Sequence, residues 1–305
     1  MRITQSMMTN SYMSGLNKNA VNLNRAFNQM TSEKRIFKLS DDPIGMGTSL
    51  AARSHLKKME QYKNNINNAK SWLDATEDSL TTINEVIKNA YERTVNMSNG
   101  TNNQEGREAA AIELEQLRDQ IVSQLNSKYN DRYLFGGYNV GIKPIEYNAG
   151  ELIYNGININ DTAEINATKD QRLSFEIASG EVFEASVSGL DVLRYGDTNI
   201  VELFDKAINE LRNPSDPFEL NIAGFLKAQD QVLRVTQQIG SKQNHLDLVL
   251  DKYGKEELNY KGLISNIEEM DLSEASVEYA KAQSIYQAAL SVGAKIMQPS
   301  LLDYL

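Results

Sequence analysis

The chain has 305 residues, which is enough for two or three domains, and it is polar and acidic. Hydrophobic residues make up 41% and the mean hydropathy is -0.47, as is typical of extended helical proteins in which every residue lies near water. The net charge of -10 disfavours nucleic acid as a partner. No apolar run approaches the ~18 residues that a membrane span needs. Without cysteine, disulfides and thiolate metal sites are excluded.

The first predicted helix carries one narrow apolar seam on an otherwise Asn- and Ser-rich surface. Its members follow one another at alternating spacings of three and four, which is the pattern of a coiled coil. They are Met13, Leu16, Ala20, Leu23, Phe27 and Met30. The segment before it, "MRITQSMMTN", lacks the apolar region of a cleaved signal peptide.

A charged stretch, "KRIFKLSDDP" at 34–43, follows the first seam. Its basic half consists of Lys34, Arg35 and Lys38, and its acidic half consists of Asp41 and Asp42, followed by Pro43. A metal site is disfavoured because the spacing of a calcium-binding loop is missing and no third acidic ligand is near. We expect an inter-domain joint, with the basic half at the C-terminus of the first helix. Ser40, Asp41 or Asp42 should cap the next helix, and proline should lie in its first turn.

The second segment is a longer seam, which keeps the same alternation through residues 59–97. A helix over this range would be about 58 Å long, so it should belong to a rod. It ends at the loop-like "SNGTNNQEG" (98–106), and a third helix is predicted from 107 to 129.

Residues 136–197 have a different pattern, in which apolar and polar side chains alternate. Two such runs, around 173–177 and 183–187, are joined by "ASGE" and predict a hairpin. An enzyme or metal site is the alternative for this segment, but it contains neither His nor Cys and its acidic residues are dispersed. We predict a small β-rich insertion.

Helical periodicity returns near residue 200, and a long seam covers 232–270. The carboxylates of "IEEM" (267–270) are expected on a solvated helix face. A last helix is predicted to carry a seam of small and aromatic residues: Ala275, Tyr279, Ala282, Tyr286, Ala289, Gly293 and Ile296.

These segments predict a mainly α protein with a small β-rich insertion. The fold class is an elongated rod of long antiparallel helices, with the N- and C-terminal helices paired as a coiled coil. The predicted domains are a terminal assembly domain (1–43 and 271–305), a long-helix rod (44–135 and 198–270) and the outer insertion (136–197). The terminal seams have little to pack against except each other, so we expect them to pack against copies of the chain. An ordinary intramolecular bundle is the alternative.

Five motifs resemble one protein family. They are "MRITQSMM" (1–8), "KRIFKLSDDPIG" (34–45), "WLDATEDSL" (72–80), "DRYLFGG" (131–137) and "MQPSLLDYL" (297–305). In this order they resemble the hook-associated proteins of the hook–filament junction of bacterial flagella, within the flagellin-like superfamily. The resemblance covers roughly residues 1–137 and 225–305, and a flagellin filament subunit is the close alternative.

The resemblance implies a structural protein with no enzymatic activity and no cofactor or metal. It implies a ring of copies at the hook–filament junction, outside the cell, between the first hook-associated junction protein and flagellin. It also implies export without a cleaved signal by the flagellar type III apparatus, with a chaperone. The assembly contacts are expected at Met13, Leu16, Leu23, Phe27, Met30, Tyr279, Ala282, Tyr286, Ala289 and Ile296.

Overall fold

A computed structural model describes residues 5–98, 103–148, 151–159, 172–195, 198–215 and 218–296. The chain divides into two compact units. Unit 1 contains Met1–Lys58 with Gly254–Leu305, and unit 2 contains Met59–Tyr253. The C-terminal motif at 297–305 and the first four residues of the N-terminal motif lie outside the described residues. The predicted division into three domains stays a prediction.

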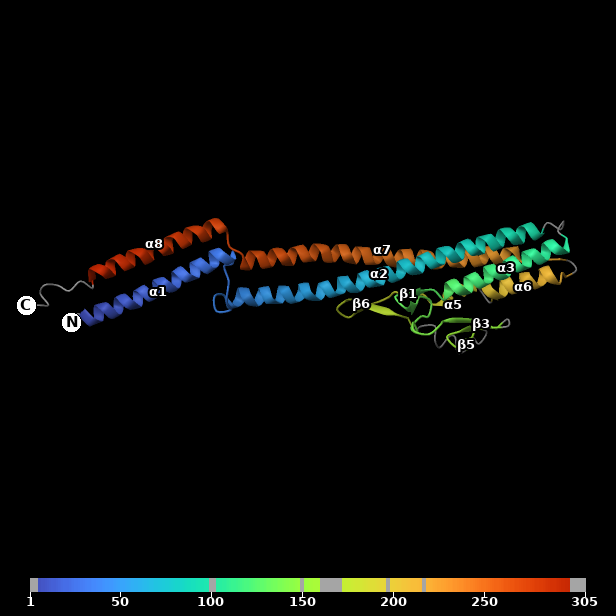
Figure 1. Cartoon of the computed structure of the whole chain (residues 1–305), viewed down its shortest axis with the longest axis horizontal. Coiled ribbons are helices and arrows are strands. Elements are labelled where there is room, and N and C mark those ends of the chain that lie inside the picture. Colours follow the sequence, from blue (N-terminus) through green and yellow to red (C-terminus); the bar gives the residue numbers. More distant parts are fainter. Residues whose placement is uncertain are drawn as a thin grey trace, which may run out of the picture. The chain divides into compact units, whose positions relative to one another are not determined.

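Unit 1 contains the two terminal helices, α1 (Gln5–Ser32) and α8 (Leu272–Ile296), which lie side by side and run antiparallel (Figure 1). The Tyr12 hydroxyl donates to the carbonyl of Ala289 at 3.1 Å. Near the other end of the pair, the rings of Phe27 and Tyr279 are 5.9 Å apart. The predicted pairing of the terminal helices is therefore confirmed.

Two long helices, α2 (Pro43–Ser98) and α7 (Ile222–Glu268), contribute residues to both units. The seam predicted at 59–97 has twelve members: Met59, Tyr62, Ile66, Ala69, Leu73, Thr76, Leu80, Ile83, Ile87, Ala90, Thr94 and Met97. Ten of them are buried in unit 2, and Tyr62 and Met97 are half-buried. This seam is confirmed because its periodicity matches the face that α2 withdraws from water. The helix itself begins earlier, at the proline of the charged stretch.

The remaining helices of unit 2 include α3 (Gln104–Leu125) and α6 (Ile200–Arg212), which lie beside each other. Phe204 of α6 packs edge-on against Phe225 of α7 at 5.2 Å between ring centroids. The prediction that α3 reaches residue 129 is wrong. Asn126 ends the helix, because its side-chain amide bonds both the carbonyl of Val122 and the backbone of Ile145.

In the described part of unit 2, nine short strands form four small antiparallel sheets. The strands are β1 (Lys128–Tyr129), β2 (Arg132–Tyr133), β3 (Ile145–Asn148), β4 (Glu151–Tyr154), β5 (Ile157–Asn158), β6 (Ser174–Ala178), β7 (Glu181–Glu184), β8 (Arg194–Tyr195) and β9 (Thr198–Asn199). The predicted hairpin is confirmed as β6–β7, with Phe175 opposite Phe183. A one-turn helix, α5 (Gly189–Leu193), also lies in the predicted β insertion, where Ser188 caps it.

The β6–β7 hairpin is held to the long helices by side chains that donate to its carbonyls. Asn65 of α2 bonds the carbonyl of Glu176 at 2.8 Å, and the Tyr253 hydroxyl bonds that of Ile177 at 2.7 Å. Lys242 of α7 donates to the carbonyl of Glu184 at 2.8 Å, and burial lowers the pKa of this lysine. The ammonium group of Lys242 thus binds the hairpin.

Candidate assembly site

Both carboxylates of the charged stretch accept hydrogen bonds from backbone N–H groups. Asp41 accepts from Lys38 N at 2.9 Å and from Phe37 N at 3.2 Å, and these bonds lower its pKa. Asp42 accepts from Gly45 N at 2.9 Å and so caps α2, in which Pro43 is the first residue. The expected cap is thus made by one aspartate, while the other holds the preceding loop. Among the described residues, no group of acidic and histidine side chains could hold a metal ion.

Two residues of the basic half, Lys34 and Arg35, contact a different helix from the one predicted. Arg35 donates to the carbonyl of Ile267 at 3.0 Å, and its backbone N–H to that of Glu268 at 2.7 Å, both at the C-terminus of α7. The expectation that the basic residues interact with the C-terminus of α1 is wrong for Arg35. Near that end, Thr31 and Ser32 hydroxyls already occupy two carbonyls of the last turns. The next residue, Glu33, has φ 55° and turns the chain away.

The carboxylate of Glu268, at the end of α7, makes several hydrogen bonds and ion pairs. Glu268 is 5% exposed, and Arg53 binds it with two nitrogens, Nε at 3.1 Å and Nη2 at 2.7 Å. The Ser49 hydroxyl also donates to it, and Lys34 Nζ lies 3.7 Å away. We call these four residues the Glu268 cluster. The hydrogen bonds from Arg53, then from Ser49, and the charges of Arg53 and Lys34 lower the pKa of Glu268 to about 2.

The expectation of a solvated face at "IEEM" is therefore wrong for Glu268 and right only for its exposed neighbour, Glu269. Sequence reasoning missed the cluster because its members are far apart along the chain. Arg53 and Glu268 are 215 residues apart, and no local spacing indicates such a pair.

On α8, the residues that are withdrawn from solvent are the described members of the predicted seam. Ala275 and Gly293 are buried, and Tyr279, Ala282, Tyr286 and Ala289 are half-buried. The side chain of Ile296 lies outside the described residues. The periodicity of small and aromatic residues thus identified the face that α8 turns toward α1.

On α1, the face toward α8 is shifted from the predicted seam. Its members alternate by three and four residues and are Thr9, Tyr12, Leu16, Asn19, Leu23, Ala26 and Met30. Leu16, Leu23 and Met30 belong to both patterns, whereas Met13 and Phe27 are 46% and 47% exposed. The less apolar pattern was overlooked because asparagine and alanine weaken its hydrophobic signal.

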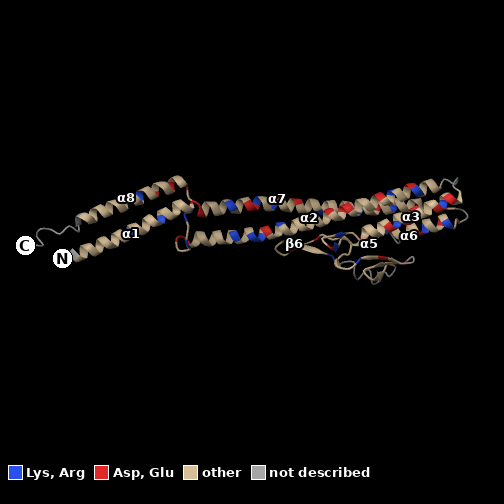
Figure 2. Ribbon diagram, in the orientation of Figure 1, with Lys and Arg blue, Asp and Glu red and all other residues tan. Residues whose placement is uncertain are grey.

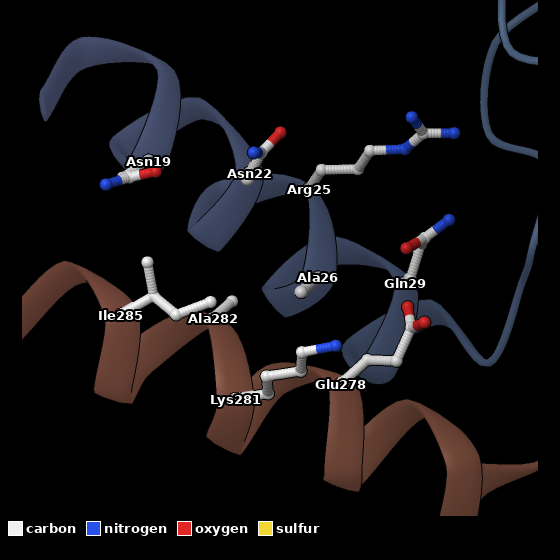
Figure 3. Close-up of a pocket in the computed structure, with 9 residues that line it drawn as sticks. All are labelled: Asn19, Asn22, Arg25, Ala26, Gln29, Glu278, Lys281, Ala282 and Ile285. Carbon is white, nitrogen blue, oxygen red and sulfur yellow. The ribbon is translucent and has the colours of Figure 1, made fainter. Parts of the chain in front are cut away.

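Among the described residues, two grooves are lined by both helices, one on each side of the pair. The first, of 320 Å³, is mainly apolar and aromatic, and it is lined by Ala20, Leu23, Asn24, Phe27, Tyr279 and Tyr286. The second, of 380 Å³, is more polar. Figure 3 shows Ala282 and Ile285 directed from α8 toward α1 there, with Glu278 and Lys281 alongside. The two sides of the pair thus present different chemistry.

The helix pair exposes apolar side chains and carries little charge on α1. Lys18 and Arg25 are the only charged residues between Gln5 and Ser32 (Figure 2). The exposed flank of α1 contains Met13 and Phe27, and α8 adds Leu290 at 45% exposure. Surfaces with contiguous exposed apolar side chains commonly mark contacts between proteins.

Comparisons with known proteins match both ends of the chain. Residues 3–140 match the family described as bacterial flagellin N-terminal helical region, and residues 224–305 match the bacterial flagellin C-terminal helical region. The flagellar hook-associated protein 3 of Salmonella typhimurium is 25% identical over 305 residues, covering 95% of each chain. The flagellin of Bacillus subtilis is 22% identical and covers 98% of this chain and 97% of its own.

A solved structure agrees with this fold. The flagellar junction protein of Legionella pneumophila superposes with a TM-score of 0.60 at 13% identity, covering 73% of this chain and all of its own. Together, the paired terminal helices and the matches at both ends define a structural protein of the bacterial flagellum. The chain belongs to the bacterial flagellin family.

Proposed function

We propose that this chain forms the junction ring that connects the hook side of the flagellum to the flagellin filament. The observation that carries this proposal is the α1–α8 pair, whose apolar flank at Met13 and Phe27 lies beside an aromatic groove. Copies of the chain would cover this flank and groove. The full-length similarity to hook-associated protein 3 of Salmonella typhimurium favours the junction over other positions in the flagellum.

The partners follow from this position. They are copies of the chain in the ring, the first hook-associated junction protein on the hook side, and flagellin on the filament side. The chain would reach the outside through the flagellar type III apparatus, without a cleaved signal and with a chaperone. Its role is structural, without catalysis or a cofactor. No described helix is long and apolar enough to cross a membrane.

In this proposal, the assembly contacts lie on both terminal helices. The residues are Met13, Leu16, Leu23, Phe27 and Met30 of α1, with Tyr279, Ala282, Tyr286, Ala289 and Ile296 of α8. The charged stretch around Asp41 and Asp42 acts as the joint between domains. Its carboxylates hold the loop and cap α2, which supports a positioning role.

A flagellin filament subunit is the alternative, because flagellins match the chain over a similar length. The two functions differ in whether copies of the protein form a long polymer. Purified protein is mixed with hook ends carrying the first junction protein and, separately, with fragments of flagellin filament. Binding at hook ends without elongation, seen by electron microscopy, is the expected result. Growth of long homopolymers on the fragments would establish the filament subunit instead.

A substitution in the aromatic groove tests whether this surface makes the assembly contact. Tyr286→Asp should reduce binding at hook ends at least about tenfold, because a carboxylate in a dehydrated contact costs several kcal/mol. Tyr138→Asp is the matched control, since Tyr138 lies in unit 2 and is 69% exposed. Loss of amide protection in α2 of the Tyr286 variant would show instead that this tyrosine supports the fold of the monomer.

A further inference from the structure

The α2–α7 pair of unit 2 is covered by different elements along its length. α3 lies against the C-terminal half of α2, where Arg93 Nε binds Glu113 Oε2 at 2.6 Å. Nearer residue 59, the β6–β7 hairpin lies against both long helices (Figure 1). Two helices bury one stripe each where they face each other, so the hairpin adds a third layer to this part of unit 2.

A bulge in β6 lies where the hairpin meets the helices. The pairing shifts register between Glu176 and Ala178, so that Ile177 is the extra residue of the bulge and has no opposite residue on β7. The carbonyls of Glu176 and Ile177 accept from Asn65 of α2 at 2.8 Å and from Tyr253 of α7 at 2.7 Å. The bulge thus binds both long helices at one place.

The bond from Tyr253 is buried, whereas the bond from Asn65 is near solvent. Ile177 is 1% exposed and Tyr253 is 7% exposed, while Asn65 is exposed. A buried carbonyl that loses its donor costs more free energy than an exposed one, because water cannot take the place of the donor. We therefore expect the Tyr253 hydroxyl to be the most important polar contact of the bulge.

Side chains rather than a further strand hold the hairpin on the helices. Among the described strands, β6 and β7 pair only with each other. On β7, the carbonyl of Glu184 accepts from Lys242 of α7, and the ring of Phe183 stacks on His245 of α7 at 6.0 Å. A two-stranded hairpin by itself is marginally stable in water. Loss of a few side-chain contacts can therefore release this hairpin as a unit.

We propose that the β6–β7 hairpin is a detachable brace on the α2–α7 pair. When it is docked, it holds 59–70 of α2 and 242–253 of α7 together. When Tyr253 releases the bulge, the hairpin leaves as a unit and these two helix segments loosen. The part of unit 2 that α3 covers stays closed. This proposal does not depend on the position of the protein in the flagellum.

Hydrogen exchange on the full-length protein tests the brace. Tyr253→Phe removes the hydroxyl and keeps the ring. Tyr62→Phe is the matched control, because Tyr62 of α2 is the other ring of the same stacked pair, with 6.3 Å between the centroids. The described residues provide no hydrogen-bond partner for the Tyr62 hydroxyl. Asn65→Ala removes the exposed contact of the bulge and should have a smaller effect than Tyr253→Phe.

We expect Tyr253→Phe to speed exchange in 174–184 at least about fivefold, because a buried carbonyl is left without its donor. Exchange in 59–70 and 242–253 should rise at least about twofold, with α3 unchanged and Tyr62→Phe like the parent. Unchanged exchange in the hairpin would overturn the brace, and so would a faster hairpin with 59–70 unchanged. Equal acceleration in α3, or equal effects of the two tyrosine variants, would also overturn it.

Thiol labelling provides a second measurement, because the chain contains no cysteine. Ile177→Cys places a thiol that is buried while the hairpin is docked, and Leu114→Cys places one in the fully buried face of α3. Adding Tyr253→Phe should speed labelling at 177 at least about fivefold and leave labelling at 114 unchanged. Equal acceleration at both positions would show that unit 2 opens as a whole, and this would overturn the brace.

Discussion

Gly293 of α8 lies against the ring of Tyr12 from α1. A β-carbon at this position would collide with the hydroxyl and ring of Tyr12, whose hydroxyl donates to the carbonyl of Ala289. The glycine therefore creates the space for the ring of Tyr12. Helix propensity alone would favour alanine here by about 1 kcal/mol.

We predict that Gly293→Ala destabilises the α1–α8 pair by about 1 kcal/mol. The ring of Tyr12 must move and lose its hydrogen bond, which outweighs the gain in propensity. Gly15→Ala is the control, because nothing lies within 4 Å of a β-carbon at that position of α1, and it should be stabilising. Exchange rates in α1 and α8 measure both. In a Tyr12→Ala background the effect of Gly293→Ala should change sign, and persistence of the destabilisation would contradict the steric explanation.

Glu268 makes the stability of unit 1 depend on acid. Its pKa in the folded chain is about 2, below the ordinary 4.5, so its contribution is fully present above pH 4.5 and is lost as the pH falls toward 2. The contribution is at most about 3 kcal/mol, because each pKa unit corresponds to 1.36 kcal/mol. Arg53 is half-exposed, and solvent reduces the value.

The prediction is that protection of α1 and α8 falls between pH 4.5 and pH 2 in the parent protein, and falls less in Glu268→Gln. The difference between the parent and the Glu268→Gln variant separates the titration of Glu268 from that of Asp41 and Asp271, whose pKa values are also lowered. Exchange measured at several pH values, corrected for intrinsic rates, gives the two curves. Parallel curves would contradict a role for Glu268 in acid sensitivity.

At the scale of the helical elements, the start of α2 depends on a tight cap. Asp42 accepts from Gly45 N, and a β-carbon at Gly45 would lie 2.5 Å from Asp42 Oδ2 and 3.1 Å from Ile36 Cδ1. The cap and the buried Ile36 thus leave room for glycine alone. The first turn of the helix is therefore specified by two residues that act together.

We predict that Gly45→Ala destabilises unit 1 by about 1–2 kcal/mol, through loss of the cap and displacement of Ile36. Gly47→Ala is the matched control two residues along α2, where nothing lies within 4 Å of a β-carbon, and it should stabilise slightly. Chemical denaturation of the two variants compares them. Equal effects of the two substitutions would contradict the cap as the cause.

The elements differ in how far sequence predicts them. The α2 seam at 59–97 and the α8 seam were predictable, because each carries one strong periodic pattern on a helix with one partner face. On α1, two patterns one residue apart compete, and the more hydrophobic one is not the one that faces α8. The fold was therefore predictable to the level of element order and pairing. The Glu268 cluster was not, since it depends on contacts more than 200 residues apart.

At the scale of the whole molecule, the two units have different stabilising interactions. The buried apolar residues of unit 1, among those described, are Ala26, Ile36, Ala52 and Ala275, whereas unit 2 buries large side chains such as Phe135 and Phe204. Most of the hydrophobic stabilisation is thus in unit 2. Unit 1 relies on helix caps, on the backbone bonds between 33–35 and 268–270, and on the Glu268 cluster.

We predict that the single chain unfolds in two steps on heating. The α1–α8 pair loses its helicity first, and unit 2 unfolds at a higher temperature. Far-ultraviolet circular dichroism should show a first loss of helix, and the tilted Phe27–Tyr279 contact allows near-ultraviolet signals to follow unit 1. A single transition that coincides by all probes would contradict this independence.

The two overlapping seams of α1 have a consequence for genetics. Leu16, Leu23 and Met30 belong to both seams, so a substitution there would disturb the pairing with α8 and also the proposed contact with a neighbouring copy. Met13 belongs to the predicted seam alone, whereas Phe27 also contacts Tyr279 of α8. Alleles at Met13 should therefore yield motility defects with a normally ordered monomer. Second-site changes in a partner protein should be able to suppress these alleles. Alleles at Leu16, Leu23 and Met30 should not be suppressed in this way, because they already disturb the pairing of α1 with α8 within the chain.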